Sequence, residues 1–226
     1  MQDTLEPALA EIAGGPTATT CAGRTDRGVH ARNQVVHLDT EAARPVSAWV
    51  RGVNAHLPDS VAVLWAHEVG GEFHARYSAR SRTYVYRLLN RAVRPALDAQ
   101  YIGWFHLPLD VEAMRAAAAL FVGERDFSAF RSSECQAKSP VRTIFQLEIS
   151  KEAETICFVI RANAFLHHMV RNIVGTLIYV GKGKHPPAWV KDVLASKQRS
   201  NAAPTFGPEG LYLEKVEYEP HWQLPT

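Results

Sequence analysis

The sequence predicts an α+β protein whose sheets are mainly antiparallel. Helix-like and strand-like segments are mixed along the whole chain, and most connections between them are as short as hairpins. The second half also reads as strand, helix, strand, strand, helix, strand, which is the split β-α-β order. With 226 residues and 46% hydrophobic content, the chain can bury one substantial core or two small ones that share an interface.

The first half opens on a helix and continues mainly in strands. Asp3 or Thr4 is expected to cap a helix that runs to Ala13, where Gly14 ends it. The elements expected next are strands at 17–22 and 34–39, a helix at 46–53, and strands at 61–65 and 82–89. If the first half had the same element order as the second, it would begin with a strand. It begins with a helix, so the sheet of this half would have a gap at the position of that strand.

The second half has clearer periodicity. An alanine-rich helix is expected at 110–122, and a hairpin is expected from two alternating runs separated by turn-like residues. The remaining expected elements are the hairpin strands at 143–150 and 156–161, helices at 165–180 and 187–196, and a closing strand at 211–218.

Composition excludes several classes of protein. No apolar run approaches the roughly 20 residues of a membrane helix, and the first 15 residues carry acids and a proline where a signal peptide would be basic and then apolar. Cys21, Cys135 and Cys157 are far apart and form no C-x-x-C pair, so neither a metal knuckle nor a redox motif is expected. We expect a cytoplasmic protein without membrane attachment.

Positive charge is concentrated in one stretch, although the net charge is only +2. Residues 73–97 hold six arginines and no acid, which would attract phosphates and therefore a nucleic acid. A solvated basic surface would have the same composition. The arginines are Arg76, Arg80, Arg82, Arg87, Arg91 and Arg94.

Asp26 stands in a loop that suits a reactive carboxylate. It lies between two arginines and two glycines, where the chain passes from one expected strand to the next. The alternative is that its side chain only closes an Asx-turn.

The helix expected at 165–180 supplies a second polar group. His168, Arg171, Asn172 and Gly175 have the spacing of one helix face, and Arg171 would project from a helix anchored in the core. A solvated stripe is the alternative. The adjacent His167 and His168 would point to different faces with no acidic or cysteine ligand nearby, so no metal site is expected.

The strand expected at 82–89 carries Arg82, Tyr84, Tyr86 and Leu88 on one face. An arginine and tyrosine stripe can hold a phosphate and stack a base. Ordinary packing within a sheet would use the same residues.

Five motifs together resemble the A-type tRNA pseudouridine synthases. They are GRTDRGVHA at 23–31, SARSRTYVYRLLN at 78–90, GERDFSAFR at 123–131, NAFLHHMVRNIVGTL at 163–177 and EGLYL at 209–213. They span nearly the whole chain in the order of the family. The resemblance implies the pseudouridine synthase fold, with two lobes at 1–98 and 99–226 that each carry a mixed, mainly antiparallel sheet with helices on one face, and a basic active-site cleft between them.

The resemblance also implies roles for residues. Asp26 corresponds to the catalytic aspartate, Tyr84 to a tyrosine against the target base, Arg171 to the basic partner of the aspartate, and Arg24 to an arginine that helps to extrude the nucleotide. We assign Arg80, Arg82 and His168 to substrate binding as well, because the two arginines are the nearest to Tyr84 in the basic stretch and His168 shares the face of Arg171.

The implied substrate is tRNA, at uridines around positions 38 to 40 of the anticodon stem-loop. The implied enzyme is a homodimer that uses no metal and no organic cofactor. In one respect the chain departs from the family, whose members begin with a further strand carrying an aspartate-glycine pair and then a tryptophan and a glutamine. This chain lacks that strand upstream of the helix near Asp3.

Several alternatives stay open from the sequence alone. Asp26 could attack the base, attack C1′ of the ribose, or remove a sugar proton. A protein of another class would bind RNA through its arginines and change nothing. A hydrolase would pair Asp26 with His30 as acid and base, and would consume water.

Overall fold

The computed structural model describes residues 1–225, which fall into two compact units. The first unit contains Met1–Arg24, Gln34–Arg80 and the residues from 218 onward. The second contains Thr25–Asn33 and Ser81–Glu217. The units are thus interleaved in the sequence, and the division into lobes at 1–98 and 99–226 stays a prediction.

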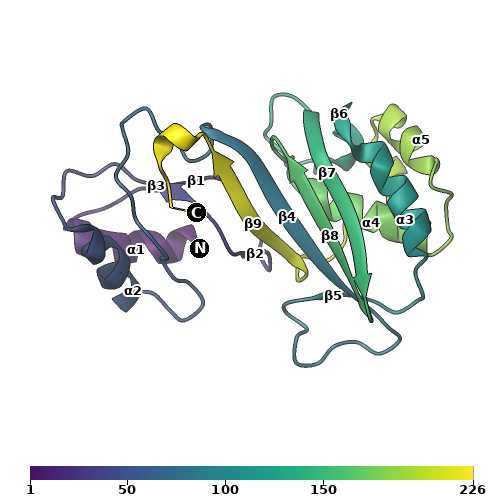
Figure 1. The fold of residues 1–226 in the computed structure, drawn as a ribbon, viewed down its shortest axis with the longest axis horizontal. Helices are drawn as coiled ribbons and strands as arrows, with labels where there is room; N and C mark the ends of the chain where they lie inside the picture. The colour runs from purple at the N-terminus through teal and green to yellow at the C-terminus, as the bar shows by residue number, and fades with distance from the viewer. Residues whose placement is uncertain (226) are drawn as a thin grey trace. The chain divides into compact units, whose positions relative to one another are not determined.

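The first unit is built around helix α1, Gln2–Ala13. Its buried residues, Leu5, Ala8 and Leu9, have the spacing of one helix face and pack with Val53 in a small core. Gly14 ends the helix in the left-handed region, with φ 80°. The other elements of this unit are β1 (Thr20–Cys21), β3 (Val36–His37), a π-helical turn (Ala48–Gly52) and α2 (Val53–Ala55), with β1 and β3 paired antiparallel (Figure 1).

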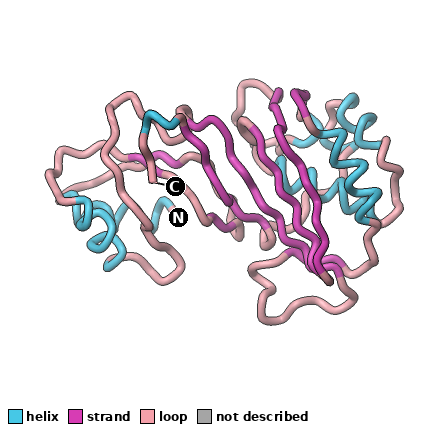
Figure 2. The backbone as a smooth tube through the Cα atoms, in the orientation of Figure 1, coloured by secondary structure: helices cyan, strands magenta, loops and turns pink. Residues whose placement is uncertain are grey.

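Two predictions for this unit are wrong. The N-cap of α1 is Met1, and no side chain caps the helix, so neither Asp3 nor Thr4 has the expected role. The strand expected at 61–65 is not formed, and Figure 2 shows this part of the chain as loop. The reason is local, because the Asn54 side chain takes the place of a neighbouring strand: its Oδ1 accepts from the Val63 amide at 2.7 Å and its Nδ2 donates to the Val63 carbonyl at 2.8 Å.

A groove of about 1140 Å³ lies within the first unit. Apolar side chains from α1, β3, the π-helical turn and the loop between α2 and β4 line much of it, among them Leu5, Leu9, Val36, Trp49 and Val63. The small core of this unit therefore borders a large hollow.

The second unit contains a seven-stranded sheet in the order β2-β9-β4-β8-β7-β6, with β5 beside β4. The β4/β8, β7/β8 and β6/β7 pairs are antiparallel, whereas β2/β9 and β4/β5 are parallel. The α+β prediction with a mainly antiparallel sheet is confirmed. The strands are β2 (His30–Ala31), β4 (Ala79–Asn90), β5 (Gly103–Phe105), β6 (Gly123–Asp126), β7 (Val141–Glu152), β8 (Thr155–Ala162) and β9 (Leu211–Tyr218).

Helices lie together on one side of the β7 and β8 part of this sheet (Figure 1). They are α3 (Val111–Ala118), continued by a 3-10 turn (Ala119–Phe121), α4 (Met169–Gly181) and α5 (Trp189–Ser196). The buried residues of β4 and β8 lie side by side on one face of the sheet, since Tyr86 pairs with Phe158 and Leu88 with Ile156. No helix within residues 1–225 is long and apolar enough to cross a membrane.

Helix α4 begins later than the sequence predicts. Its first residue is Met169, and His168 before it has a left-handed backbone with φ 63°. The preceding loop is held by the Asn163 side chain, whose Oδ1 accepts from the amides of Thr143 at 3.0 Å and Ala164 at 2.8 Å. Residues 165–168 therefore form a loop that leads into the helix.

Candidate active site

The Asp26 loop is a tight turn in the second unit. The Val29 amide donates to the Asp26 carbonyl at 3.0 Å, and Gly28 lies within this turn with φ 81°. A Cβ on Gly28 would also lie 3.0 Å from Pro208, so glycine is required there for both conformation and space. The Asp26 carboxylate contacts side chains at the start of α4, which excludes a role limited to an Asx-turn.

Arg171 is the basic partner that the Asp26 carboxylate contacts. Its Nη1 lies 3.0 Å from Oδ2 of Asp26, so the predicted proximity of the two side chains is confirmed. Its Nε donates to the Phe206 carbonyl at 2.8 Å, which fixes the guanidinium from a second direction. The arginine side chain is only 14% exposed, so the alternative of a solvated stripe is wrong.

Two histidines complete the surroundings of the carboxylate. Nε2 of His167 lies 3.2 Å from Oδ1 of Asp26, and Nε2 of His168 lies 3.1 Å from Oδ2. Burial lowers the pKa of His168, although the Asp26 charge opposes this effect. The expectation that the two rings point to different faces is wrong, because both precede the helix and their centroids are 4.0 Å apart.

The predicted polar face of α4 is covered by residues 199–207. Asn172 is fully buried, and its Oδ1 accepts from Arg199 at 3.0 Å and from Thr205 at 2.7 Å. A Cβ on Gly175 would lie 2.3 Å from the Pro204 carbonyl oxygen. The segment therefore lies directly on the helix, which places the Phe206 carbonyl against Arg171.

The stripe on β4 is the buried face of that strand. Tyr84 is 8% exposed and packs edge-on against Phe165, with 5.0 Å between the ring centroids. Arg82 is 7% exposed and donates to the Asn163 carbonyl at 3.0 Å. Both residues thus support the loop that precedes α4. A contact of Arg82 with phosphate, or of Tyr84 with a base, stays a prediction.

Tyr86 links the same strand to the segment that covers α4. Its hydroxyl donates to the Gly207 carbonyl at 2.9 Å, and burial raises the pKa of this phenol strongly. Sequence periodicity placed Tyr86 on this face but gave no indication of the partner, which lies more than a hundred positions away in the chain.

The remaining predicted substrate contacts, Arg24 and Arg80, belong to the compact unit that does not contain Asp26. Arg24 is exposed and belongs to the first unit, as does Arg80, which forms an ion pair with Glu219. Arg91 pairs with Glu154 at 3.2 Å, so folding brings acids to a stretch that has none in sequence. The members of the stretch that are exposed are Arg76, Arg80, Arg87, Arg91 and Arg94.

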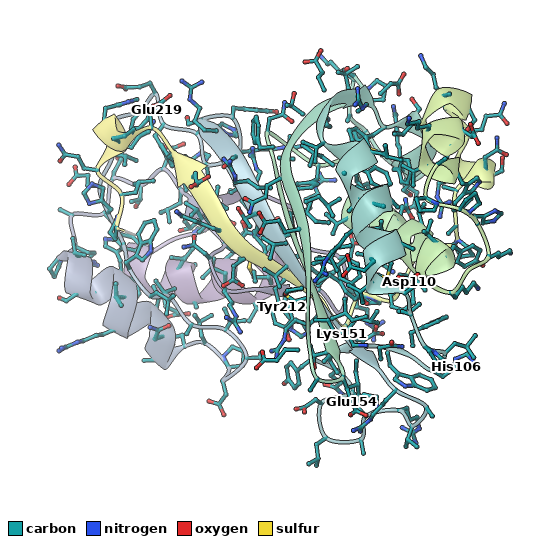
Figure 3. The ribbon with its side chains drawn as sticks, turned by 45° about the vertical axis from the view of Figure 1, so that its right-hand side comes forward. His106, Asp110, Lys151, Glu154, Tyr212 and Glu219 are labelled. Carbon is teal, nitrogen blue, oxygen red and sulfur yellow. The ribbon has the colours of Figure 1, made fainter. Side chains whose placement is uncertain are left out.

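His30 does not form the pair that a hydrolase would need. Its Nε2 lies 2.8 Å from the Gln100 carbonyl, and its ring stacks on Tyr212, with 4.9 Å between the centroids. Tyr212, labelled in Figure 3, belongs to β9, the neighbour of the β2 strand that carries His30. Asp26 has His167 as its partner in place of His30. Sequence reasoning missed His167 as a member of the site, and its adjacency to His168 was the available signal.

Comparison with known proteins identifies the family. Residues 1–78 and 117–219 match the model of a family described as tRNA pseudouridine synthase. The tRNA pseudouridine synthase A of Dechloromonas aromatica is 56% identical over 225 residues, which cover 100% of this chain and 86% of the relative. That of Bordetella petrii is 57% identical over 99% of this chain and 84% of the relative, and that of Nitrosomonas eutropha is 54% identical over 100% and 82%. The chain therefore belongs to the tRNA pseudouridine synthase family.

Proposed function

We propose that this protein isomerises uridine to pseudouridine in tRNA, with Asp26 as the catalytic carboxylate. The observation that carries the proposal is the ion pair between Asp26 and Arg171, at 3.0 Å, in a chain that is 56% identical to a tRNA pseudouridine synthase A. Three side chains, His167, His168 and Arg171, offer donors to this one carboxylate. Such donors stabilise a negative charge, as a nucleophile or a base requires.

The reaction requires a bond exchange within one nucleotide. The N1 to C1′ bond breaks, the uracil turns, a C5 to C1′ bond forms, and the proton on C5 leaves while N1 gains one. Asp26 would act at the sugar or at the base. The nucleotide must leave its stack at a cost of a few kcal/mol, which contacts to the backbone and base stacking would offset.

The target positions in tRNA and the oligomeric state are proposed from the resemblance to the A-type tRNA pseudouridine synthases. We place the target uridines around positions 38 to 40 of the anticodon stem-loop, and we expect a homodimer. Reverse-transcription mapping of carbodiimide-treated tRNA would locate the modified positions. Light scattering on the purified protein would give its mass in solution. Modification confined to another arm of tRNA, or a monomer at assay concentrations, would contradict the corresponding assignment.

The decisive experiment uses tRNA labelled with tritium at uracil C5, because pseudouridine formation releases that label without cleaving the chain. The parent should release the label, and Asp26→Asn should not, while its affinity for tRNA stays within a few-fold. This substitution keeps the side-chain shape and removes the charge. Comparable turnover by Asp26→Asn would remove Asp26 from the catalytic role.

A further inference from the structure

Asp26, His167 and His168 have the arrangement of three ligands around one small cation. One atom from each residue, a carboxylate oxygen or an imidazole nitrogen, lies within 4.8 Å of the others. Two histidines and a carboxylate form a common ligand set of zinc sites that keep a fourth position open. The expectation of no nearby acidic ligand for these histidines is therefore wrong.

Each oxygen of the Asp26 carboxylate has an imidazole nitrogen close to it. Nε2 of His167 is 3.2 Å from Oδ1 of Asp26, and Nε2 of His168 is 3.1 Å from Oδ2. Zinc bonds of about 2.0–2.1 Å place two tetrahedral ligands about 3.3–3.4 Å apart. Each of these two oxygen–nitrogen pairs is within a few tenths of an ångström of that separation, and one atom from each of the three residues lies within 4.8 Å of the others.

The backbone holds both histidines in this arrangement before any ion binds. His168 has φ 63°, a conformation that costs a non-glycine residue about 1–2 kcal/mol and that turns its ring beside that of His167. The His167 amide donates to the Cys135 sulfur at 3.5 Å.

We propose that Asp26, His167 and His168 bind Zn²⁺ and that the bound ion inhibits the enzyme reversibly. A carboxylate that coordinates an ion cannot also react with the nucleotide, and the ion would occupy the space that the nucleotide must enter. Each histidine would bind through Nε2 and carry its proton on Nδ1. Arg171 remains beside Oδ2 and repels a dication, so the site should be weaker than a structural zinc site.

The ligand set also defines which ions bind. Imidazole nitrogen favours Zn²⁺, Co²⁺ and Ni²⁺, whereas Mg²⁺ and Ca²⁺ favour oxygen ligands. The ions that accompany tRNA in an assay, such as Mg²⁺, should therefore leave this site empty. Activity should survive a chelator, and a preparation that carries zinc should become more active when EDTA is added.

The first test needs no RNA. Co²⁺ titrated into the metal-free protein should give the visible d–d absorption of tetrahedral coordination, with one ion per chain, and Zn²⁺ should abolish it. Asp26→Asn and His168→Gln should each weaken Co²⁺ binding by at least the roughly tenfold that loss of an outer-shell partner costs. The matched control is His106→Gln, because His106 is an exposed histidine on another part of the unit (Figure 3), and it should bind as the parent does.

Absence of tetrahedral absorption in the parent, or its persistence in Asp26→Asn and His168→Gln alike, would overturn the proposal. Circular dichroism would identify a variant that does not fold, and His167→Gln would then replace it.

The second test rests on the proposed function and measures tritium release from tRNA. Zn²⁺ should inhibit the parent competitively with tRNA, EDTA should reverse the inhibition, and Mg²⁺ should have no effect. Zinc that binds without inhibiting would overturn the inhibitory role. A parent with the expected cobalt spectrum but no metal-free activity on tRNA would instead count against the proposed function.

Discussion

At the scale of single residues, the two carboxylate oxygens of Asp26 have different neighbours. Oδ2 faces both Arg171 and His168, whereas Oδ1 faces His167. The arginine is itself held by the Phe206 carbonyl, so it has little freedom to leave. Oδ1 is therefore the oxygen with more remaining capacity to meet a substrate.

Arg171 should be needed for activity through Asp26. Arg171→Met should lose most of the label-release activity, because it leaves the partly buried carboxylate without its counter-ion. Arg171→Lys should keep more activity, since a positive charge remains but the fork that reaches both Asp26 and Phe206 is lost.

The coupling between the two residues is measured by a double-mutant cycle on kcat/KM. Because the two side chains form one unit, Asp26→Asn with Arg171→Met should be little worse than Asp26→Asn alone. Losses that simply add would show that Arg171 contributes independently of the carboxylate.

At the scale of elements, the arrangement around the site depends on close contact between α4 and the segment at 199–207. Gly175 lies at this contact, and an added Cβ would lie 2.3 Å from the Pro204 carbonyl oxygen. The segment cannot accept a larger residue there without a shift of its backbone. Such a shift would carry the Phe206 carbonyl, and with it Arg171.

Gly175→Ala should therefore reduce kcat more than it reduces affinity for tRNA. A misplacement of about 1 Å can cost on the order of 100-fold in rate, and overpacking of this kind costs about 1–3 kcal/mol of stability. Steady-state kinetics and urea unfolding would measure both. The matched control is Gly71→Ala, where an added Cβ meets nothing within 4 Å, and it should change neither quantity much.

The long elements could be predicted from sequence, whereas three short strands could not. β1 and β3 lie within the strands expected at 17–22 and 34–39 but span only two residues each. Helix α1 and strand β9 have clear periodicity, so their ranges agree with expectation to within a residue. β2, β5 and β6 each have two to four residues, which is too short for a period to be recognised. Their strand character comes from their partners in the sheet.

The same contrast holds for the site. The proximity of Asp26 and Arg171 followed from the family resemblance, because no local rule connects residues 145 positions apart. The pairing of His167 with the carboxylate occurs next to the left-handed backbone of His168, and a sequence pattern gives no sign of that conformation in a histidine.

At the scale of the whole molecule, the Asp26 cluster is formed within one compact unit. Asp26, His167, His168 and Arg171 all belong to the second unit, although the Asp26 loop is joined at both ends to segments of the first. Most of the exposed arginines of the basic stretch also belong to the second unit. The first unit contributes Arg76 and Arg80.

The exposed arginines should determine how strongly salt weakens tRNA binding. Substitution of a phosphate-contacting arginine by alanine should reduce the slope of log K against log salt by roughly 0.7 to 0.9. The positions to test are Arg76, Arg80, Arg87, Arg91 and Arg94. Lys191→Ala, an exposed position outside the stretch, serves as the control. Equal slopes for the parent and all five variants would make this surface merely solvated.

The groove in the first unit should make that unit the less stable one. Apolar side chains at this groove, such as Val36, Trp49 and Val63, are only partly buried, so they contribute less to stability than the side chains of a filled core. Amides of α1 should therefore exchange with deuterium faster than those of α4, as mass spectrometry of peptic fragments would show. Equal protection of the two helices would contradict this.

A difference in stability between the two units would also determine how the protein loses its activity on heating. Opening of the first unit would expose the apolar side chains of α1 while the sheet of the second unit is still intact, and partly opened molecules of this kind associate before they can close again. Heat inactivation would then be irreversible and faster at higher protein concentration. Its onset would lie below the temperature at which the aromatic core around Tyr86 and Phe158 melts.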